Sequence, residues 1–302
     1  MLPGPGSLRV TVTDETGLPI PAKVQLVGFD GSPDPLSTQT ILGLIHNTTG
    51  VFGEQREDGL SYGIAFVTFA DRTGDTGVVE VEPGTYQLVV SHGPRYSAFF
   101  QNVTISEGAT STVAAQVGHV VPTPGFIAAD FHVHSIQSPD SEVTLAERVT
   151  TMLADGMDFF TPSDHDIRVD YGPTLTAMGV TDLISTAPSA EITTFDYGHF
   201  NAWPMTIDPG QVNGGGIDWG RAGVPPGMDF PSLGSYGLSP AEIYAAVHAI
   251  PGALIQINHI RSHFNTDGLD IDTAEGGTGP PQSHTPPAQR RLDPSLTNLF
   301  DD

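Results

Sequence analysis

The chain has 302 residues, enough for two ordinary domains or one large one. It contains no cysteine, so disulfides and thiolate metal sites are excluded, and any metal must be held by imidazole and carboxylate groups. The formal net charge of -24 argues against nucleic acid or an anionic membrane as a partner. A low content of charged residues with abundant Gly and Pro is typical of a secreted or periplasmic protein, although the first residues lack the basic start and apolar core of a signal peptide.

Residues 7–120 are predicted to form an all-β domain. Several short segments alternate apolar and polar residues with the period of a half-buried strand, and Gly or Pro turns separate them. The segments are Leu8–Thr13, Ala22–Val27, Val78–Val81, Thr85–Val90 and Ser111–Val117. This pattern indicates a small β-sandwich. Within it, residues 30–76 form a long excursion rich in Gly, Asp and Thr, whose one clear feature is an apolar run at Ile64–Phe69.

A change of composition at residues 121–125 marks a linker, so we predict an accessory β-sandwich at 1–120 and a second domain at 126–302. In the second domain, Thr144 and Glu147 form a capping box for one helix. Another helix is expected to begin near Ser239. Apolar strand-like segments alternate with these helices, and this order predicts a parallel sheet.

Metal-ligand side chains recur where these apolar segments end. Successive side chains of a strand point to opposite faces, so His132 and His134 share one face. Further along the chain, His165, Glu191 and His259 each follow an apolar run. In α/β barrels, functional groups gather at the C-terminal ends of the strands. The sequence therefore predicts that these side chains converge on bound metal.

The ordered segments around these residues resemble the PHP (polymerase and histidinol phosphatase) superfamily, in particular its CehA/McbA-type metallohydrolases. The segments are His132-Val133-His134-Ser135 with Asp140, Ser163-Asp164-His165-Asp166, Glu191-Ile192-Thr193-Thr194 with Gly198-His199-Phe200-Asn201, and Ile257-Asn258-His259. The resemblance covers nearly the whole chain. It implies an N-terminal β-sandwich followed by a distorted α/β barrel of PHP type that holds two or three divalent ions.

The same resemblance assigns ligands to each ion. His132 and His134 would bind the first metal, and Glu191 would bridge the first and the second. His199 and His259 would complete the second site, and a third would use Asp140 and His165. The family pattern also needs an Asp-x-His near the end of the barrel. The chain ends at Asp302 without one, so we expect a barrel that is incomplete at its C-terminus.

Imidazole and carboxylate ligands of this kind suit Zn, Mn or Fe. A bound metal makes hydroxide available near neutral pH, which predicts hydrolysis of a small phosphate ester or of a carboxylic or carbamate ester. Arg261 is a candidate for holding the substrate anion, and Asp166 and His263 are candidates for proton transfer or for positioning a ligand.

Two other functions compete with this hypothesis. The chain could be a non-catalytic or truncated metal-binding protein whose β-sandwich is a binding or adhesion module. A polymerase-associated PHP proofreading domain fits poorly, because a net charge of -24 would repel DNA. The sequence favours neither a particular metal nor an oligomeric state.

Overall fold

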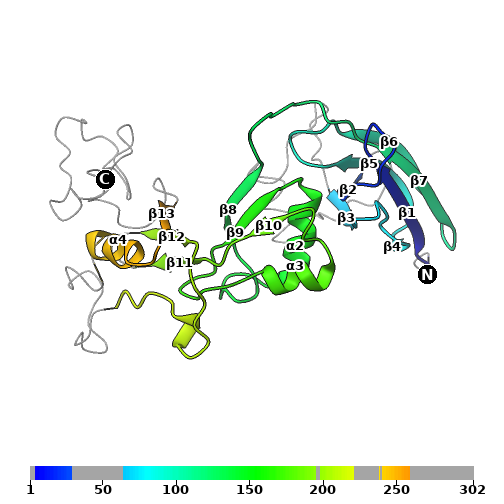
Figure 1. The fold of residues 1–302 in the computed structure, drawn as a ribbon. Helices are drawn as coiled ribbons and strands as arrows, with labels where there is room; N and C mark the ends of the chain where they lie inside the picture. Colours follow the sequence, from blue (N-terminus) through cyan, green and yellow to red (C-terminus); the bar gives the residue numbers. More distant parts are fainter. Residues whose placement is uncertain (1–3, 29–63, 195–197, 221–237, 239, 259–302) are drawn as a thin grey trace, which may run out of the picture. The chain divides into compact units, whose positions relative to one another are not determined.

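A computed structural model describes residues 4–28, 64–194, 198–220, 238 and 240–258 (Figure 1). The chain divides into two compact units. The first contains residues 1–129, 146–158 and 182–184, and the second contains residues 130–145, 159–181 and 185–302. The predicted domain boundary at 121–125 stays a prediction.

The first unit contains two β-sheets. One has the strand order β4-β1-β7 and the other has the order β3-β2-β5-β6. Their bounds are β1 (Gly6–Thr13), β2 (Ala22–Gly28), β3 (Ile64–Ala70), β4 (Val79–Val81), β5 (Gly84–Ser91), β6 (Phe99–Ile105) and β7 (Thr110–Gln116). β1 and β7 pair in parallel, whereas β2 pairs antiparallel with both β3 and β5.

Alternating apolar residues from the two sheets form one core. Leu8 and Val10 of β1 and Leu26 of β2 are fully buried in it, together with Leu88 of β5. On β1 and β2, the residues between the buried ones are polar and less buried, as the period-two pattern predicts. Tyr86 brings a phenol into this apolar core, and its hydroxyl donates to the Glu82 carbonyl at 2.7 Å. That bond satisfies a polar group which burial would otherwise penalise.

Helix α2 (Leu145–Ala154) belongs to the first unit, apart from its first residue. Val149, Met152 and Leu153 are its larger buried side chains. The residues that follow the helix are held by Arg95, whose guanidinium donates to the Gly156 carbonyl at 2.6 Å and pairs with Asp158 at 2.8 Å. The helix predicted from the capping box is therefore confirmed.

The second unit contains two separate three-stranded sheets. The first has the order β10-β9-β8, with β9 and β10 parallel. Its elements are β8 (Ala129–Val133, whose first residue belongs to the first unit), β9 (Phe159–Pro162), β10 (Ser185–Thr186) and the contacting helix α3 (Gly172–Met178). Phe160 of β9 and Tyr171 before α3 are fully buried and meet edge to face, with ring centroids 4.9 Å apart.

The other sheet of this unit has the order β11-β12-β13, and both pairings are antiparallel. Its strands are β11 (Ala190–Thr193), β12 (His199–Trp203) and β13 (Leu254–Ile257), and a 3-10 turn η1 (Val212–Gly214) and helix α4 (Pro240–His248) lie between β12 and β13 in sequence. Ile243 and Val247 of α4 pack on Ile192 and Phe200 of the sheet. The helix predicted to begin near Ser239 is confirmed.

The expected α/β barrel is wrong. A barrel of this class needs a continuous series of parallel strands that closes on itself. Here the parallel sheet ends at β10, and β11 instead begins an antiparallel sheet with β12. Strands also outweigh helices throughout the described residues, which contain no closed barrel. None of the helices in this part of the chain is both long and apolar enough for a membrane span.

Candidate metal centre

The sheet β11-β12-β13 has one apolar face and one polar face, and both are buried over most of β11 and β12. Ile192, Phe200 and Ile257 point toward the apolar cluster that includes α4. The intervening residues occupy the opposite face because side chains alternate along a strand. Glu191 of β11 lies there directly opposite Asn201 of β12 in the register. Glu191 therefore lies within a strand, one residue after its start, and not beyond a strand end.

Glu191 is the centre of a cluster of histidines. Its side chain is completely buried, and four imidazole nitrogens lie close to its two carboxylate oxygens. Oε1 is 3.6 Å from His132 Nε2 and 3.2 Å from His199 Nδ1, and Oε2 is 3.4 Å from His134 Nε2 and 3.1 Å from His165 Nδ1. Each oxygen thus faces two histidines from different parts of the chain.

Two asparagines position the carboxylate. The side-chain amide of Asn258 donates to Glu191 Oε1 at 2.7 Å and to Asn201 Oδ1 at 2.8 Å. Asn201 in turn donates to the Phe131 carbonyl, one residue before His132. All of these amide contacts are buried or half-buried, where an ordered network restricts side-chain rotation. The network connects the end of β13, β12 and β8 to Glu191.

Backbone hydrogen bonds place His165 beside the carboxylate. Glu191 N–H donates to the Asp164 carbonyl at 3.1 Å, and Asp166 N–H donates to the Glu191 carbonyl at 2.8 Å. His165 Nδ1 also lies 2.6 Å from the Thr193 hydroxyl. Asp164 is fully buried and accepts from Ser135 N–H at 2.7 Å, which holds the chain just after His134. Burial raises the pKa of the Asp164 carboxyl despite this bond.

Asp140 lies at the more exposed side of the cluster. Its carboxylate is 3.4 Å from His134 Nδ1 and 3.3 Å from His165 Nε2. Ser138 donates to the same carboxylate at 2.7 Å and lies 3.1 Å from His134 Nδ1. Each of these two histidines therefore has one ring nitrogen beside Asp140 and the other beside Glu191.

The spacing of these atoms suits a metal. Two ligands held 2.0–2.2 Å from one ion at a tetrahedral angle are roughly 3.3–3.6 Å apart. The four Glu191 to histidine distances, 3.1–3.6 Å, overlap this range. Burial lowers the pKa of His134, although Asp140 and Glu191 oppose that shift. Low basicity favours the neutral imidazole, which is the form that binds metal.

Three overlapping groups of ligand atoms result. They are His132-His134-Glu191, His165-Glu191-His199 and His134-Asp140-His165, and the ligand atoms of each lie within 4.8 Å of one another. The structure thus brings together six of the seven metal ligands expected from the sequence. The seventh, His259, lies outside the described residues, as do Arg261 and His263.

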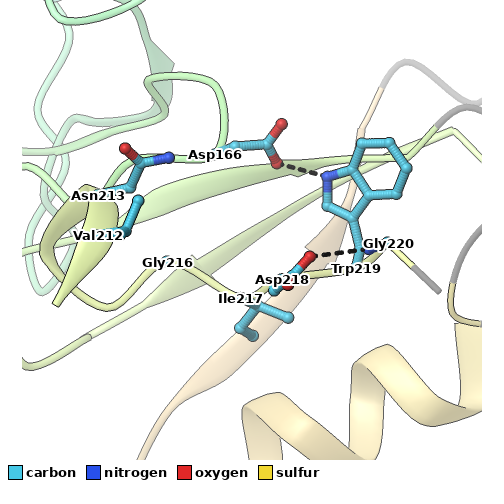
Figure 2. Close-up of a pocket in the computed structure, with 8 residues that line it drawn as sticks. All are labelled: Asp166, Val212, Asn213, Gly216, Ile217, Asp218, Trp219 and Gly220. Carbon is cyan, nitrogen blue, oxygen red and sulfur yellow. Dashed lines mark hydrogen bonds between the residues drawn. The ribbon is translucent and has the colours of Figure 1, made fainter. Parts of the chain in front are cut away.

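Asp166 is outside all three groups. Its Oδ1 accepts from Thr193 N–H at 2.9 Å and from the indole N–H of Trp219 at 2.9 Å (Figure 2). Burial raises the pKa of this carboxyl, and those two hydrogen bonds oppose the increase. Asp166 lines a pocket of about 520 Å³ that also contains Trp219.

Sequence reasoning missed the roles of Asn201, Asn258 and Trp219. Asn201 and Asn258 stand beside predicted ligands in the sequence, but their contacts with each other and with Glu191 depend on antiparallel pairing. A register that brings residues 191, 201 and 258 together leaves no local signal in a single sequence. Trp219 likewise reaches Asp166 across 53 positions of the chain.

Comparisons with known proteins give no family. No protein-family model matches the chain. No curated protein matches it either. Solved structures that match include the Bacillus anthracis TIE protein, with 9% identity over 46% of this chain and 20% of that one and a TM-score of 0.24. The minor pilin GBS52 of Streptococcus agalactiae has 16% identity over 42% of this chain and 49% of that one, with a TM-score of 0.23. The major pilin subunit BcpA of Bacillus cereus has 13% identity over 39% of this chain and 31% of that one, with a TM-score of 0.24.

These findings correct the expected membership of the PHP superfamily. No family model and no curated protein supports that membership. The solved structures named above are described as pilins or as the TIE protein. The predicted ester or phosphoester hydrolase is corrected with it, since no family model and no curated protein supports such an activity. The chain spans only 20–49% of the length of the three proteins described. With TM-scores of 0.23–0.24, these structures assign no function to the chain.

Proposed function

We propose that this chain is a non-catalytic protein that binds divalent metal through Glu191 and the histidines around it. The observation that carries the proposal is the completely buried Glu191 carboxylate, with four imidazole nitrogens 3.1–3.6 Å from its oxygens. A buried charge is costly unless it is paired or coordinates metal. A divalent ion would neutralise the carboxylate and use the imidazole lone pairs together.

The arrangement supports two ions that share Glu191. The group His132-His134-Glu191 and the group His165-Glu191-His199 have no histidine in common. A carboxylate has two oxygens, and each oxygen of Glu191 faces one histidine from each group, so both groups can share this carboxylate. The third group, His134-Asp140-His165, reuses a histidine from each of the others. Filling it would require those rings to bind through both nitrogens.

The donor set narrows the choice of metal. Imidazole suits zinc, iron and several other transition metals, and carboxylate accepts manganese as well. Thiolate ligands are excluded because the chain has no cysteine. The hydrogen bonds from Asn258 to Glu191 and from Asn201 to the Phe131 carbonyl orient the ligands without binding the ion. Such outer contacts typically strengthen a metal site.

The two sheets of the first unit are assigned to a separate role, as a binding or adhesion module. Supporting this division is the position of the ligands, because all three described groups lie in the second unit. The first unit has an apolar core of its own, formed by both of its sheets. Exposed apolar side chains on that unit include Phe100, which is 61% exposed.

The test is the metal content of the whole chain. Purified protein is stripped with EDTA, exposed separately to Zn, Mn and Fe(II) ions, dialysed and analysed by mass spectrometry of the elements. Two ions per chain are expected for the unmodified protein. Glu191→Gln removes the bridging charge and is expected to leave at most one weakly held ion.

His199→Gln and His248→Gln provide a matched pair of substitutions. His199 belongs to the cluster, whereas His248 is an exposed residue of α4 outside the three groups. The proposal predicts loss of bound metal for His199→Gln alone. No retained metal in the unmodified protein, or the same content in all three variants, would refute it.

A further inference from the structure

The pocket beside Asp166 has the size and construction of a small-ligand site. Its volume is about 520 Å³, within the roughly 300–1,000 Å³ common for ligand pockets. It is lined by Asp166, Val212, Asn213, Gly216, Ile217, Asp218, Trp219 and Gly220 (Figure 2). All of these residues belong to the second unit.

The backbone around this pocket is unusual. Asp166 and Asn213 have φ values of 58° and 53°, and they are the non-glycine residues with positive φ in the described part of the chain. Both line the pocket. Gly216 approaches so closely that a Cβ atom there would lie 2.4 Å from the Asp166 carbonyl oxygen. Left-handed backbone at residues with side chains is costly and gathers at ligand sites.

The chemistry of the lining favours a cation. Asp166 and Asp218 contribute carboxylates, and none of the described lining residues is basic. Trp219 contributes an indole whose N–H is fixed on Asp166 Oδ1 at 2.9 Å. The same ring packs against the apolar cluster formed by β11, β12, β13 and α4, which restricts its motion. An indole attracts cations through its π face, most strongly when they are poorly hydrated.

We propose that this pocket binds a small organic ammonium ion, with the Trp219 ring and the Asp166 and Asp218 carboxylates as its recognition groups. Val212 and Ile217 supply apolar surface for the alkyl substituents. A quaternary ammonium group fits best, because its charge is spread over methyl groups that contact both the indole and these side chains. The site is separate from the proposed metal ligands, since none of its lining residues belongs to the three ligand groups.

The experiment is calorimetric titration of the whole chain with choline and with 3,3-dimethylbutan-1-ol, which has the same shape and hydroxyl group but no charge. Both titrations are performed on EDTA-treated protein and on zinc-loaded protein. Choline is expected to bind at least about tenfold more tightly than its neutral analogue in both preparations. Because both probes carry the hydroxyl, coordination of that group to a metal cannot produce the difference.

Variants locate the binding. Trp219→Leu is expected to weaken choline binding about three- to thirtyfold. Gly220 N–H donates to the Asp218 carboxylate at 3.1 Å. Asp218→Asn removes one charge but keeps an oxygen that can accept this hydrogen bond. Asp208→Asn is its matched control, because Asp208 accepts Gly210 N–H at 2.9 Å in a similar turn and does not line the pocket.

The proposal predicts weaker choline binding for Asp218→Asn and unchanged binding for Asp208→Asn. Equal binding of choline and the neutral alcohol, or no choline binding, would overturn it. Binding of methyl glucoside without choline would overturn it in favour of a carbohydrate site. Equal losses in Asp218→Asn and Asp208→Asn would show only a general effect of net charge. Loss of choline binding does not affect the metal-content test, so the two proposals can fail separately.

Discussion

The two sheets of the first unit and the sheet β11-β12-β13 of the second use the same alternation for different purposes. On β1, the residues between Leu8, Val10 and Val12 are polar and less buried. On β11 and β12, the residues between the apolar ones are also buried, and they include Glu191 and Asn201. One sheet system therefore buries an apolar face, and the other buries an apolar face and a polar one.

The two kinds of buried face differ in what they contribute to the free energy of folding. Burial of Leu8, Leu88 and their neighbours stabilises the first unit by about 1.5–3 kcal/mol for each large side chain. Burial of Glu191 opposes folding unless its charge is compensated. We infer that the first unit is stable without a ligand, whereas the polar face of the second unit depends on the ion that we propose binds there.

Leu88→Ala gives the largest expected effect in this comparison. Leu88 is fully buried, so its truncation should lower the free energy of unfolding of the first unit by about 2–5 kcal/mol. Leu18→Ala is the control in the same unit, because Leu18 is 64% exposed. Hydrogen exchange followed by mass spectrometry measures both units separately. Equal protection of β5 in the two variants would contradict the assignment of the core.

Asn258→Ala tests the polar face of the second unit. It removes donors to Glu191 and Asn201, and loss of such an outer contact should weaken zinc binding about 10–100-fold. Titration against a chelator of known affinity measures this change. The control is Asn102→Ala at an exposed position of β6. Unchanged zinc affinity in Asn258→Ala would show that the amide network does not position the ligands.

The smallest expected effect is the pH dependence of stability caused by His92, a histidine outside the three ligand groups. Burial is the main cause that lowers its pKa, while its contact with the Ala154 carbonyl at 3.2 Å opposes the shift. The unfolded chain therefore binds a proton first as pH falls below about 6.5. Stability is full above that pH and decreases as pH falls toward the folded-state pKa, by at most about 1.4 kcal/mol per pH unit.

Urea unfolding of the first unit between pH 7.5 and 5.0, compared in the unmodified protein and His92→Gln, checks this sign. The variant should lose less stability over the interval. A larger loss in His92→Gln, or identical pH dependence, would contradict the role assigned to the buried ring.

Local patterns in the sequence predicted much of the first unit. Alternation located β1, β2, β4, β5 and β7, and the apolar run at 64–69 became β3. β6 was missed because Phe100, Gln101 and Asn102 are exposed in succession, so its N-terminal half lacks a buried alternating face. Whether a segment forms a strand is reflected in its local sequence, because a strand with one buried face alternates apolar and polar residues.

Pairing direction is a property of distant segments, and it explains the failure of the barrel prediction. Glu191 was expected to follow an apolar run at a strand end, but residues 183–189 contain only the short β10, and β11 begins at Ala190, one residue before Glu191. The chain then reverses into β12, where Thr194 donates to the Gly198 carbonyl at 2.8 Å. The histidines and acids of the cluster could be predicted from the sequence. The contacts of Asn201 and Asn258 could not, because they arise from the antiparallel pairing that follows this reversal.

X-ray absorption spectroscopy of the zinc-loaded chain tests the central claim most directly. The account predicts a first shell of nitrogen and oxygen at about 2.0–2.2 Å, with the outer-shell scattering of several imidazoles. Glu191→Gln should lower the zinc content and change this first shell, whereas His248→Gln should leave both unchanged. A shell of oxygen alone without imidazole scattering, or the same spectrum in Glu191→Gln, would contradict metal binding by the Glu191 cluster.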